Sequence, residues 1–477
     1  MTRPLVRFAR WFYPGLGVKR WLLMAAFGCV LLVNGITRWF VAEGSQWRVN
    51  EAIDSAFADL GMPLEALSYA FIVLGALLVI LGIRQWMRSI VVAIDPLGKN
   101  SIVEALMDRK LRGGYKIVAI GGGTGLSTLL RGLKVQTSNL TAVVTVTDDG
   151  GSSGRLQKEL GILPPGDIRN CLVALSDDEA LVTDLFRYRF SEGEGLTGHS
   201  FGNLFLAAMT GITGNFDKAV KESSRVLNIK GRVMPSTLST VRLCARLVDG
   251  TRVFGETNIS SSHEPIAELS LDPAGSQPLR EVLDAIAAAD AIVLGPGSLY
   301  TSVLPNFLIE GVARAVGDSR AAKVYVCNVM TQPGETDAFT ASAHVRALLE
   351  HAGARVCDYA IVNEEPPKRL LEAYAEGGQV PVDADRAAIA ALGVRVVGAN
   401  VISETQNVRH DPQRLAEVVL RLIDEHVAAR ASFVRVPPTK QYSRNYRVAV
   451  GRTTALGFAN TWRLRLLRSR KPRAGGR

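Results

Sequence analysis

The chain has 477 residues, 47% of them hydrophobic, and a formal net charge of +10 at pH 7. Residues 1–20 and 463–477 hold clusters of Lys and Arg without any acidic residue, whereas the long region between them is slightly acidic. This central region has no bulk positive field, which excludes nucleic acid as its partner. The five cysteines form no CxxC pair and predict buried free thiols in a reducing compartment: Cys29, Cys171, Cys244, Cys327 and Cys357.

Two apolar segments come first in chain order, and we expect them to be transmembrane helices at 21–42 and 64–83. Each has a long run without charge and approaches the roughly 20 residues that a helix needs to cross hydrocarbon. Tryptophans near the segment ends favour the membrane interface. A cleaved signal peptide and a buried core hairpin are the alternatives. The second apolar segment argues against a signal peptide, and the basic outer flanks argue against a core hairpin.

The charges around these segments predict their topology. Residues 1–20 form a basic tail, whereas the joining loop, residues 43–63, has one basic residue, Arg48, among four acidic ones. Because basic residues stay on the cytoplasmic side, loop 43–63 should face outside and both termini the cytoplasm. We therefore expect a multi-pass cell-membrane protein with a basic linker at 84–113 and a cytoplasmic main domain.

Strand-like and helical patterns alternate from residue 114 to residue 432, which predicts an α/β domain. We expect a Rossmann-like fold with a mostly parallel sheet and flanking helices, whose ligand binds beyond the carboxyl ends of the strands. Strands are expected at 116–120, 142–147, 291–294, 324–329, 358–362 and 394–402. Helices are expected at 126–133, 279–289, 306–316, 338–351 and 413–429. Residues 433–477 should form a basic, solvated tail, with attachment to anionic lipid as the alternative.

A glycine-rich loop joins the first strand to its helix in the sequence KIVAIGGGTGLSTLLRGL, residues 116–133. Such a loop lets the backbone approach an oxyanion and presents amide groups at a helix N-terminus. It has no GK[ST] and Leu126 replaces the third glycine of the dinucleotide fingerprint, so neither common template fits. A tight strand-to-helix turn is the alternative. The candidate phosphate contacts are Gly121, Gly122, Gly123, Thr124 and Gly125.

The sequence TDDGGSSG, residues 147–154, ends the second predicted strand and places Asp148 beside Asp149. Adjacent carboxylates repel each other unless a cation or a shared proton lies nearby. Mg²⁺ bridging to phosphate would satisfy them, since it takes one or two carboxylates together with ligand oxygens. The two aspartates are thus candidate metal ligands, and Ser152 and Ser153 are candidate ligand contacts. A solvated turn in which Asp caps a helix is the alternative.

Three later motifs, PPGDIRN, GHSFGN and GPGSLYTS, add polar groups at helix starts and loops. His199 could be a general base or bind a sugar hydroxyl, and a structural loop histidine is the alternative. The third motif repeats the strand–glycine–helix design and is a second candidate anion site. Two anion loops on one sheet suit a diphosphate-containing nucleotide better than a lone phosphate. The candidate residues are Asp167, Arg169, His199, Asn203, Gly297, Ser298 and Thr301.

Over residues 114–432 the chain resembles the gluconeogenesis factor family of bacteria, relatives of the 2-phospho-L-lactate transferases. The resemblance rests on GGGTG, DDGGSSG, PPGDIRN, GHSFGN, GPGSLYTS, MTQPGET and RHDP in this order. It implies a Rossmann-like fold, binding of UDP-sugars, and a role in cell shape and envelope synthesis during gluconeogenic growth. It also implies that Tyr359 in DYAIVN and Arg409 in RHDP contact the nucleotide sugar.

Two motifs depart from the transferase branch, which has NTGDD and PDLDT where this chain has TVTDDGGSSG and PPGDIRN. We therefore expect a nucleotide-sugar-binding regulator tethered at the membrane. A Mg²⁺-dependent transferase acting on a nucleotide-activated phosphorylated acid is the alternative, and Mg²⁺ is the cofactor that the sequence suggests. The sequence leaves open which sugar is bound, whether a reaction is catalysed and whether the protein is a homo-oligomer.

Overall fold

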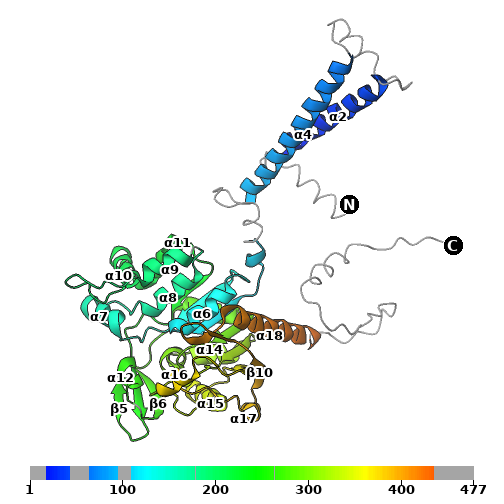
Figure 1. Cartoon of the computed structure of the whole chain (residues 1–477). Coiled ribbons are helices and arrows are strands. Elements are labelled where there is room, and N and C mark those ends of the chain that lie inside the picture. Colours follow the sequence, from blue (N-terminus) through cyan, green and yellow to red (C-terminus); the bar gives the residue numbers. More distant parts are fainter. Residues whose placement is uncertain (1–17, 43–63, 95–108, 178, 263, 434–477) are drawn as a thin grey trace, which may run out of the picture. The chain divides into compact units, whose positions relative to one another are not determined.

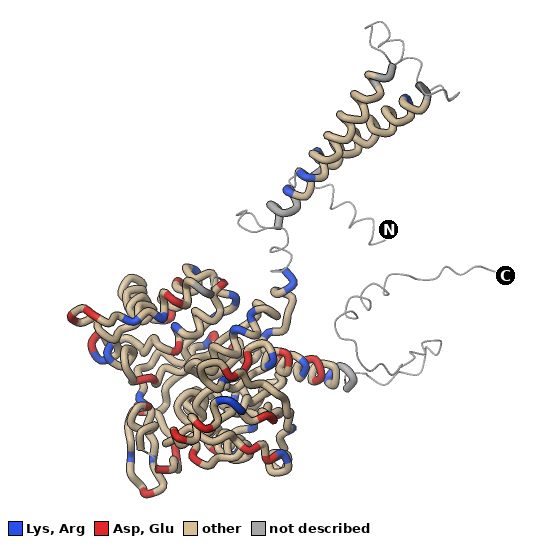
Figure 2. The backbone as a smooth tube through the Cα atoms, viewed as in Figure 1, with Lys and Arg blue, Asp and Glu red and all other residues tan. Residues whose placement is uncertain are grey.

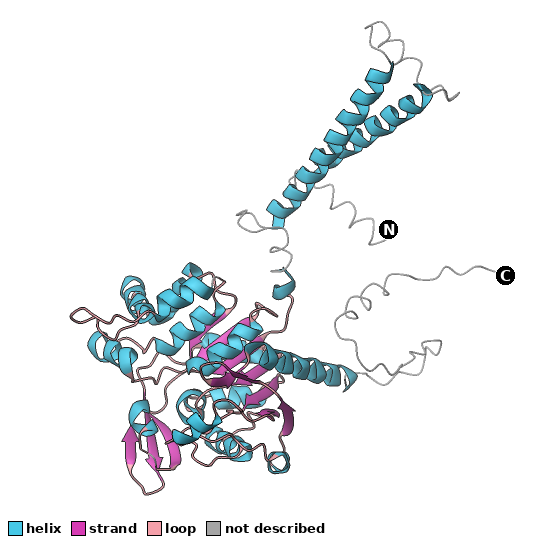
Figure 3. Cartoon of the chain, in the orientation of Figure 1, coloured by secondary structure: helices cyan, strands magenta, loops and turns pink. Residues whose placement is uncertain are grey.

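Seven parallel strands form the central sheet of the α/β domain (Figures 1 and 3). The computed structural model describes residues 18–42, 64–94, 109–177, 179–262 and 264–433. The strands lie in the order β10-β9-β8-β7-β1-β2-β3, and all neighbours pair in parallel. Their bounds are β1 Ile117–Gly121, β2 Leu140–Val144, β3 Arg232–Pro235, β7 Ala291–Leu294, β8 Ala322–Val326, β9 Tyr359–Asn363 and β10 Arg395–Ala399. The predicted α/β fold is confirmed.

Helices flank this sheet and bury its central strands (Figure 3). β1, β2, β7 and β8 are buried at every position, as expected of parallel strands covered on both faces. The helices are α6 Gly123–Leu133, α7 Gly151–Leu160, α8 Gly166–Leu175, α9 Glu179–Arg187, α10 Phe201–Thr213, α11 Phe216–Val226, α12 Glu256–Ser260, α13 Arg280–Ala287, α14 Val312–Asp318, α15 Ala341–Ala352, α16 Leu371–Glu376, α17 Arg386–Ala391 and α18 Pro412–Phe433. A π-turn, η2 Leu299–Val303, and a 3₁₀ turn, η3 Leu304–Asn306, precede α14.

The strand order reverses at β1. From β1 the chain adds β2 and β3 on one side, and later adds β7 to β10 on the other. In the pairing of β1 with β7, Ile117 lies opposite Ala291 and Ile120 lies opposite Leu294. The loops after these two strands therefore leave the sheet at the same level. A crevice opens at such a switch point, and both predicted anion loops lie there.

Two predicted elements are divided in the structure. The expected helix at 306–316 is confirmed only from Val312, where α14 begins: η3 ends at Asn306, and Gly311 between them has a φ of +79°. A residue in that left-handed conformation cannot continue a right-handed helix. The expected strand at 394–402 separates into β10 and a short hairpin, β11 Ile402–Glu404 with β12 Val408–His410.

The sequence reading also missed a small antiparallel sheet in the order β5-β4-β6. Its strands are β4 Arg242–Leu247, β5 Arg252–Phe254 and β6 Ile266–Asp272, and α12 lies between β5 and β6 along the chain. Figure 1 shows this sheet beside α12, at one end of the α/β domain. This insertion carries α12 to the edge of the crevice described below.

The N-terminal helices are α2 Val18–Ala42 and α4 Leu64–Ile94, and they pack against each other as a hairpin. Four glycines allow the close contact, because an added Cβ on any of them would lie within 2.9 Å of the other helix: Gly28, Gly35, Gly75 and Gly82. Residues 21–37 and 66–83, the central stretches of the two helices, contain no charged residue (Figure 2). Their most apolar stretches, Arg20–Phe40 and Ser68–Ser89, are long enough to cross a membrane, and 11% of each is buried within the protein.

The predicted linker, the predicted buried cysteines and the predicted tails can be compared with the structure. α4 continues past Arg84 to Ile94, through the first part of the predicted linker. Cys29 is exposed on α2, so the prediction of buried thiols is wrong for this residue, whereas the other four cysteines are free and buried. Most of the basic N-terminal tail and of the C-terminal tail, together with the loop predicted to be external, lies outside the described residues.

Candidate functional site

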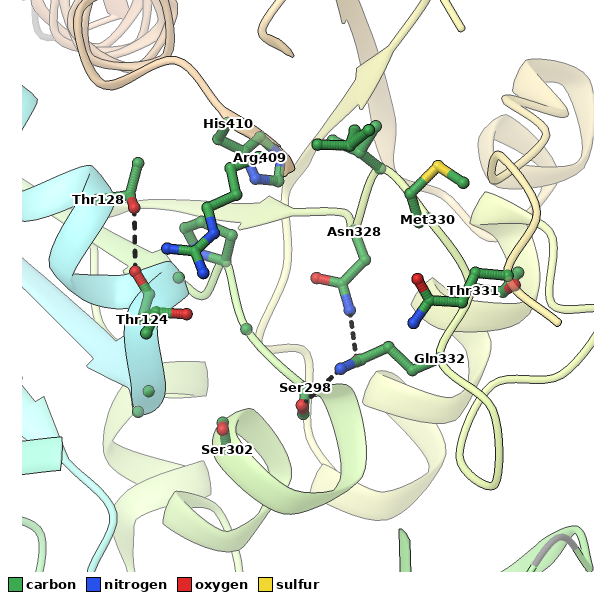
Figure 4. A pocket seen from close by; sticks show the side chains of 18 of the residues that line it. Thr124, Thr128, Ser298, Ser302, Asn328, Met330, Thr331, Gln332, Arg409 and His410 are labelled. Atoms are coloured by element: carbon green, nitrogen blue, oxygen red, sulfur yellow. Dashed lines mark hydrogen bonds between the residues drawn. The ribbon is translucent and has the colours of Figure 1, made fainter. Parts of the chain in front are cut away.

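A cleft of about 350 Å³ lies at the switch point of the sheet (Figure 4). The loops after β1 and β7 form one wall, and the loop after β8 and the β11–β12 hairpin form the other. Eight of the predicted site residues line it: Gly122, Gly123, Thr124, Gly125, Asp167, Gly297, Ser298 and Arg409. The structure therefore brings both predicted anion loops and the predicted arginine to one cavity.

The two glycine loops touch backbone to backbone. A Cβ on Gly125 would lie 2.4 Å from the carbonyl oxygen of Pro296 and 3.0 Å from the amide nitrogen of Gly297. Gly123 begins α6 with a φ of +65°, a conformation that glycine adopts without strain. The N-terminus of this 11-residue helix faces the cleft and favours an anion there.

Asp167 lies against the first glycine loop. A Cβ on Gly122 would be 2.4 Å from its Oδ2, and its carboxylate accepts a hydrogen bond from the amide of Gly123. Burial, and then the nearby charge of Asp148, raise its pKa to about 6. A carboxylate at the anion loop disfavours a bare phosphate beside it, so a proton or a cation must accompany the ligand's negative charge.

Glu256, which the sequence reading missed, also lines the cleft. It is the first residue of α12 and belongs to the inserted antiparallel sheet region. Burial, followed by the charges of Asp148 and Asp167, raises its pKa to about 9. At neutral pH its carboxyl group is protonated and can donate a hydrogen bond to a ligand oxygen. No motif around Glu256 signals this position, because it depends on the packing of the insertion.

The two adjacent aspartates have different partners. Asp149 Oδ1 accepts hydrogen bonds from the backbone nitrogen of Thr257 at 3.0 Å and from its Oγ1 at 2.9 Å, and so caps α12. Asp148 Oδ1 accepts a hydrogen bond from the nitrogen of Gly150 at 3.0 Å. A Cβ on Gly166, next to Asp167, would be 2.8 Å from Asp148 Oδ2. Asp148 thus lies beside Asp167, and Asp149 holds α12. Neither Asp148 nor Asp149 is among the residues that line the cleft.

The different partners of Asp148 and Asp149 affect which residues could hold the predicted Mg²⁺. Among the described residues, no group of three or more His, Cys, Asp and Glu side chains is arranged to hold a metal ion. Mg²⁺ needs only one or two carboxylates when a ligand supplies phosphate oxygens. Asp167, which lines the cleft, and Asp148 beside it repel each other and fit that requirement, whereas the contacts of Asp149 are taken up by α12.

Four further candidates form a buried polar network that joins α7, α8 and α10. Ser152 Oγ lies 2.9 Å from His199 Nδ1 and accepts a hydrogen bond from Asn203 Nδ2 at 3.1 Å. Arg169 donates to Ser200 Oγ at 2.6 Å and to Asn203 Oδ1 at 3.1 Å. Burial lowers the pKa of His199. None of these side chains lines the cleft, and their contacts favour the structural alternative for His199.

The second loop is held by hydrogen bonds to the loop after β8. Gln332 Nε2 donates to Ser298 Oγ at 2.8 Å, and Asn328 Nδ2 donates to Gln332 Oε1 at 3.0 Å (Figure 4). Thr301 instead donates to Glu335 Oε1 at 3.1 Å in the interior, where burial raises the pKa of Glu335. Gly121 and Ser153 are buried and lie outside the cleft lining.

The structure separates Tyr359 from the other candidates. Tyr359 is the first residue of β9, where its hydroxyl lies 3.1 Å from His426 Nδ1 and the Arg395 guanidinium lies 5.8 Å from its ring centre. The cleft is at the opposite, carboxyl edge of the sheet. Tyr374 of α16 lines it instead, and its hydroxyl accepts a hydrogen bond from the nitrogen of Val408 at 3.0 Å.

The chain, including the domain that contains this cleft, is similar to several known proteins. The family described as 2-phospho-L-lactate transferase CofD matches residues 117–402. A gluconeogenesis factor of Bacillus subtilis (strain 168) is 50% identical over 312 residues, 65% of this chain and 98% of its own length. A relative from Nostoc sp. is 47% identical over 418 residues, 86% of this chain and 92% of its own length, so similarity to it extends beyond the α/β domain.

A solved structure has the same fold. The crystal structure of a member of the UPF0052 family from Bacillus halodurans superposes with a TM-score of 0.63 and is 49% identical. It covers 64% of this chain and 99% of its own length. Together these similarities support the architecture around the cleft.

Proposed function

Because the chain belongs to the gluconeogenesis factor family, we propose that it binds a UDP-sugar in the cleft, tethered to the cell membrane by α2 and α4. The bound state then supports cell shape and envelope synthesis during growth on gluconeogenic carbon. The observation that carries the proposal is the meeting of two glycine loops and Arg409 around one cavity of about 350 Å³. Two sets of loop amides and one guanidinium match the oxygens of a diphosphate.

The other wall of the cleft suits the rest of the ligand. Asn328, Thr331, Gln332 and Gln379 line it with amide and hydroxyl groups, which hydrogen-bond sugar hydroxyls and base edges. Polar groups of this kind orient a ligand within a concave site. Binding, rather than turnover, is the function favoured by the departures from the transferase motifs and by the capping role of Asp149.

Calorimetric titration of the full-length protein in detergent tests this proposal. UDP-glucose and other UDP-sugars should bind, with ADP-glucose as the control for the base, and each titration is run with and without Mg²⁺. Failure of every UDP-sugar to bind would overturn the proposal. In cells, an Arg409→Ala variant should lose normal shape on gluconeogenic carbon while its abundance stays unchanged.

A Mg²⁺-dependent transferase is the second candidate, because Asp167 lies where the phosphates would bind and Asp148 lies beside Asp167. Mg²⁺ held by these carboxylates would neutralise charge at a reacting phosphate. The transferase requires formation of a product from a nucleotide-activated phosphorylated acid, lost in Asp148→Asn. If UDP-sugars bind tightly and no such product forms, the transferase is contradicted and only the binding function is supported.

The membrane topology is also a proposal. Cys29 lies within the proposed span of α2 and is exposed on that helix, so the test uses a Cys29→Ser background in which labelling comes from the introduced cysteine. A cysteine placed at Ser45, in loop 43–63, should react with an impermeant reagent on intact cells. Labelling only after lysis would contradict an external loop and a cytoplasmic α/β domain.

A further inference from the structure

Glu256 presents an unused carboxyl group to the cleft. It is the first residue of α12, is partly buried and lines the cavity. Its carboxyl group forms no hydrogen bond with any residue that the structure describes, yet neither of its oxygens is fully buried. A polar side chain that is open to a cavity and is not engaged by the protein can orient a bound ligand.

Contacts at both ends of α12 fix this helix to the α/β domain. At the start of the helix, Gly255 lies so close to the Asp149 carboxylate that a Cβ would have no room. At the end of the helix, Ser260 Oγ donates a hydrogen bond to Glu335 Oε1 at 3.0 Å, and Gly334 packs without room for a Cβ against the Ser260 carbonyl oxygen. Glu256 is therefore held in place before a ligand binds, which lowers the cost of ordering it.

The same anchor joins α12 to the segment that follows the second glycine loop. Glu335 Oε1 accepts a hydrogen bond from Ser260 and another from Thr301 Oγ1, at 3.1 Å. Thr301 belongs to η2, and its neighbour Ser302 lines the cleft. Glu256, which is one helical turn from Ser260, thus enters the cleft from the side of η2.

This side of the cleft is opposite the β11–β12 hairpin. In Figure 4 Ser298 and Ser302 lie on one side of the cavity, and Arg409 and His410 lie on the other. The Arg409 side chain extends from the hairpin toward the Thr124 loop. The glycine loops therefore lie between the hairpin and the side at which α12 enters.

A nucleotide sugar carries its diphosphate between the nucleoside and the sugar. In the proposed complex the glycine loops and Arg409 bind the diphosphate, so the nucleoside and the sugar extend to opposite sides. Aromatic and apolar side chains of the hairpin side suit a flat base: Tyr374, Val329, Met330 and Val408. The side of Glu256 is then left for the sugar.

We propose that the carboxyl group of Glu256 hydrogen-bonds the hydroxyl groups of the sugar and is a specificity-determining residue for the sugar part of the ligand. The inference rests on the proposed binding of nucleotide sugars. A protonated carboxyl group offers both a donor and an acceptor, and each sugar hydroxyl can pair with either. Since the raised pKa of Glu256 keeps it protonated at neutral pH, it adds no charge that would repel the diphosphate.

The test compares UDP-glucose with UDP by calorimetry on the full-length protein in detergent at pH 7. The two ligands differ in charge, but this difference is the same for every variant, so a change in the ratio of their affinities reports the sugar. Glu256→Ala should lower the affinity for UDP-glucose relative to UDP by about 3- to 10-fold, the range of one neutral hydrogen bond, with the affinity for UDP unchanged. Glu256→Gln keeps a donor and an acceptor and should retain most of the wild-type ratio.

Glu268→Ala is the matched control. Glu268 is an exposed glutamate on β6 of the same inserted sheet, lies 2.7 Å from Arg246 and is outside the cleft lining, so its removal should leave the ratio as in the wild type. Melting curves establish that each variant folds.

Two outcomes would overturn the role of Glu256 while the proposed function stands. In the first, Glu256→Ala keeps the wild-type ratio. In the second, Glu256→Ala weakens UDP and UDP-glucose equally, so that the residue acts on the nucleotide part or on the fold. If the wild type binds no UDP-sugar, the proposed function itself fails and this inference with it.

Discussion

The two walls of the cleft are built in different ways. The phosphate wall, residues 122–125 with residues 297 and 298, consists of two short loops that each follow a strand directly. The hairpin wall, residues 328–332 and 408–410 with Tyr374, gathers segments from three separate parts of the chain. The first wall is held by backbone contact between glycines and Pro296, and the second by side-chain hydrogen bonds such as that between Tyr374 and Val408.

This difference predicts how each wall responds to mutation. A backbone contact has no flexible atoms that can move aside, so small changes at the phosphate wall should have large effects. Side-chain contacts on the hairpin wall contribute separately, so single changes there should have graded effects on affinity. The predictions below test this contrast, from the largest expected effect to the smallest.

Gly125→Ala should have the largest effect. Its methyl group would meet the Pro296 carbonyl at 2.4 Å, so the two loops must separate. Displacement of positioned groups by about 1 Å can cost on the order of 100-fold, and we expect that loss in UDP-glucose affinity by calorimetry. The control is Gly211→Ala in α10, where an added methyl group meets nothing within 4 Å. An unchanged affinity in Gly125→Ala would show that the two loops do not act as one unit.

Arg409→Ala should weaken UDP-glucose binding by about 10- to 150-fold, since a hydrogen bond to a charged group contributes about 1.5–3 kcal/mol. Arg409 is exposed on β12 and lines the cleft. The matched control is Arg395→Ala, on the opposite edge of the sheet beside Tyr359. If both variants lose affinity equally, the effect is one of overall charge and not of the hairpin wall.

The two tyrosines separate structural placement from family resemblance. Tyr374→Phe removes the acceptor for the Val408 nitrogen and should lower UDP-glucose affinity by about 3- to 10-fold, the range of one neutral hydrogen bond. Tyr359→Phe should leave affinity unchanged, because that residue is at the far edge of the sheet. A loss of affinity in Tyr359→Phe alone would place the ligand away from the cleft.

Glu256→Gln should change the pH dependence of stability. The folded-state pKa of Glu256 is raised from 4.5 to about 9, so its contribution to stability is full below pH 4.5 and is lost as the pH rises toward 9. Glutamine has no proton to lose, so the variant should gain melting temperature over the wild type with rising pH. A gain of about 2–4 °C would correspond to about 1 kcal/mol. Equal melting curves at pH 5, 7 and 9 would contradict the burial of this carboxyl group.

Asp149 should have the smallest effect. Asp149→Ala removes the cap of α12 and should cost about 1 kcal/mol of stability. Asp149→Asn keeps an oxygen that accepts the hydrogen bonds from Thr257, so it should retain most of the stability that Asp149→Ala loses. Chemical denaturation measures both variants. A normal stability of Asp149→Ala with loss of Mg²⁺-dependent affinity would instead assign Asp149 to the metal.

The sequence by itself determined the features that depend on neighbouring residues. Alternation of apolar strands and helices was enough to predict the parallel sheet, and strand–glycine–helix patterns identified two loops that both line the cleft. These signals are local, because a glycine turn and a helix start involve only a few consecutive residues. The motif around Arg409 also led to a residue that lines the cleft.

Only the tertiary structure decided which distant groups meet. Asp149 and Thr257 are 108 positions apart, so nothing near Asp149 could show that it caps α12 rather than facing Asp167. The positions of Glu256, Tyr374 and His410 likewise follow from the packing of an insertion, a helix and a hairpin. Tyr359, which the family resemblance implied, begins β9 and does not line the cleft, a placement that its sequence motif does not show. The direction of the chain and the neighbours of each strand, which exist only once the sheet has formed, determine which end meets the ligand.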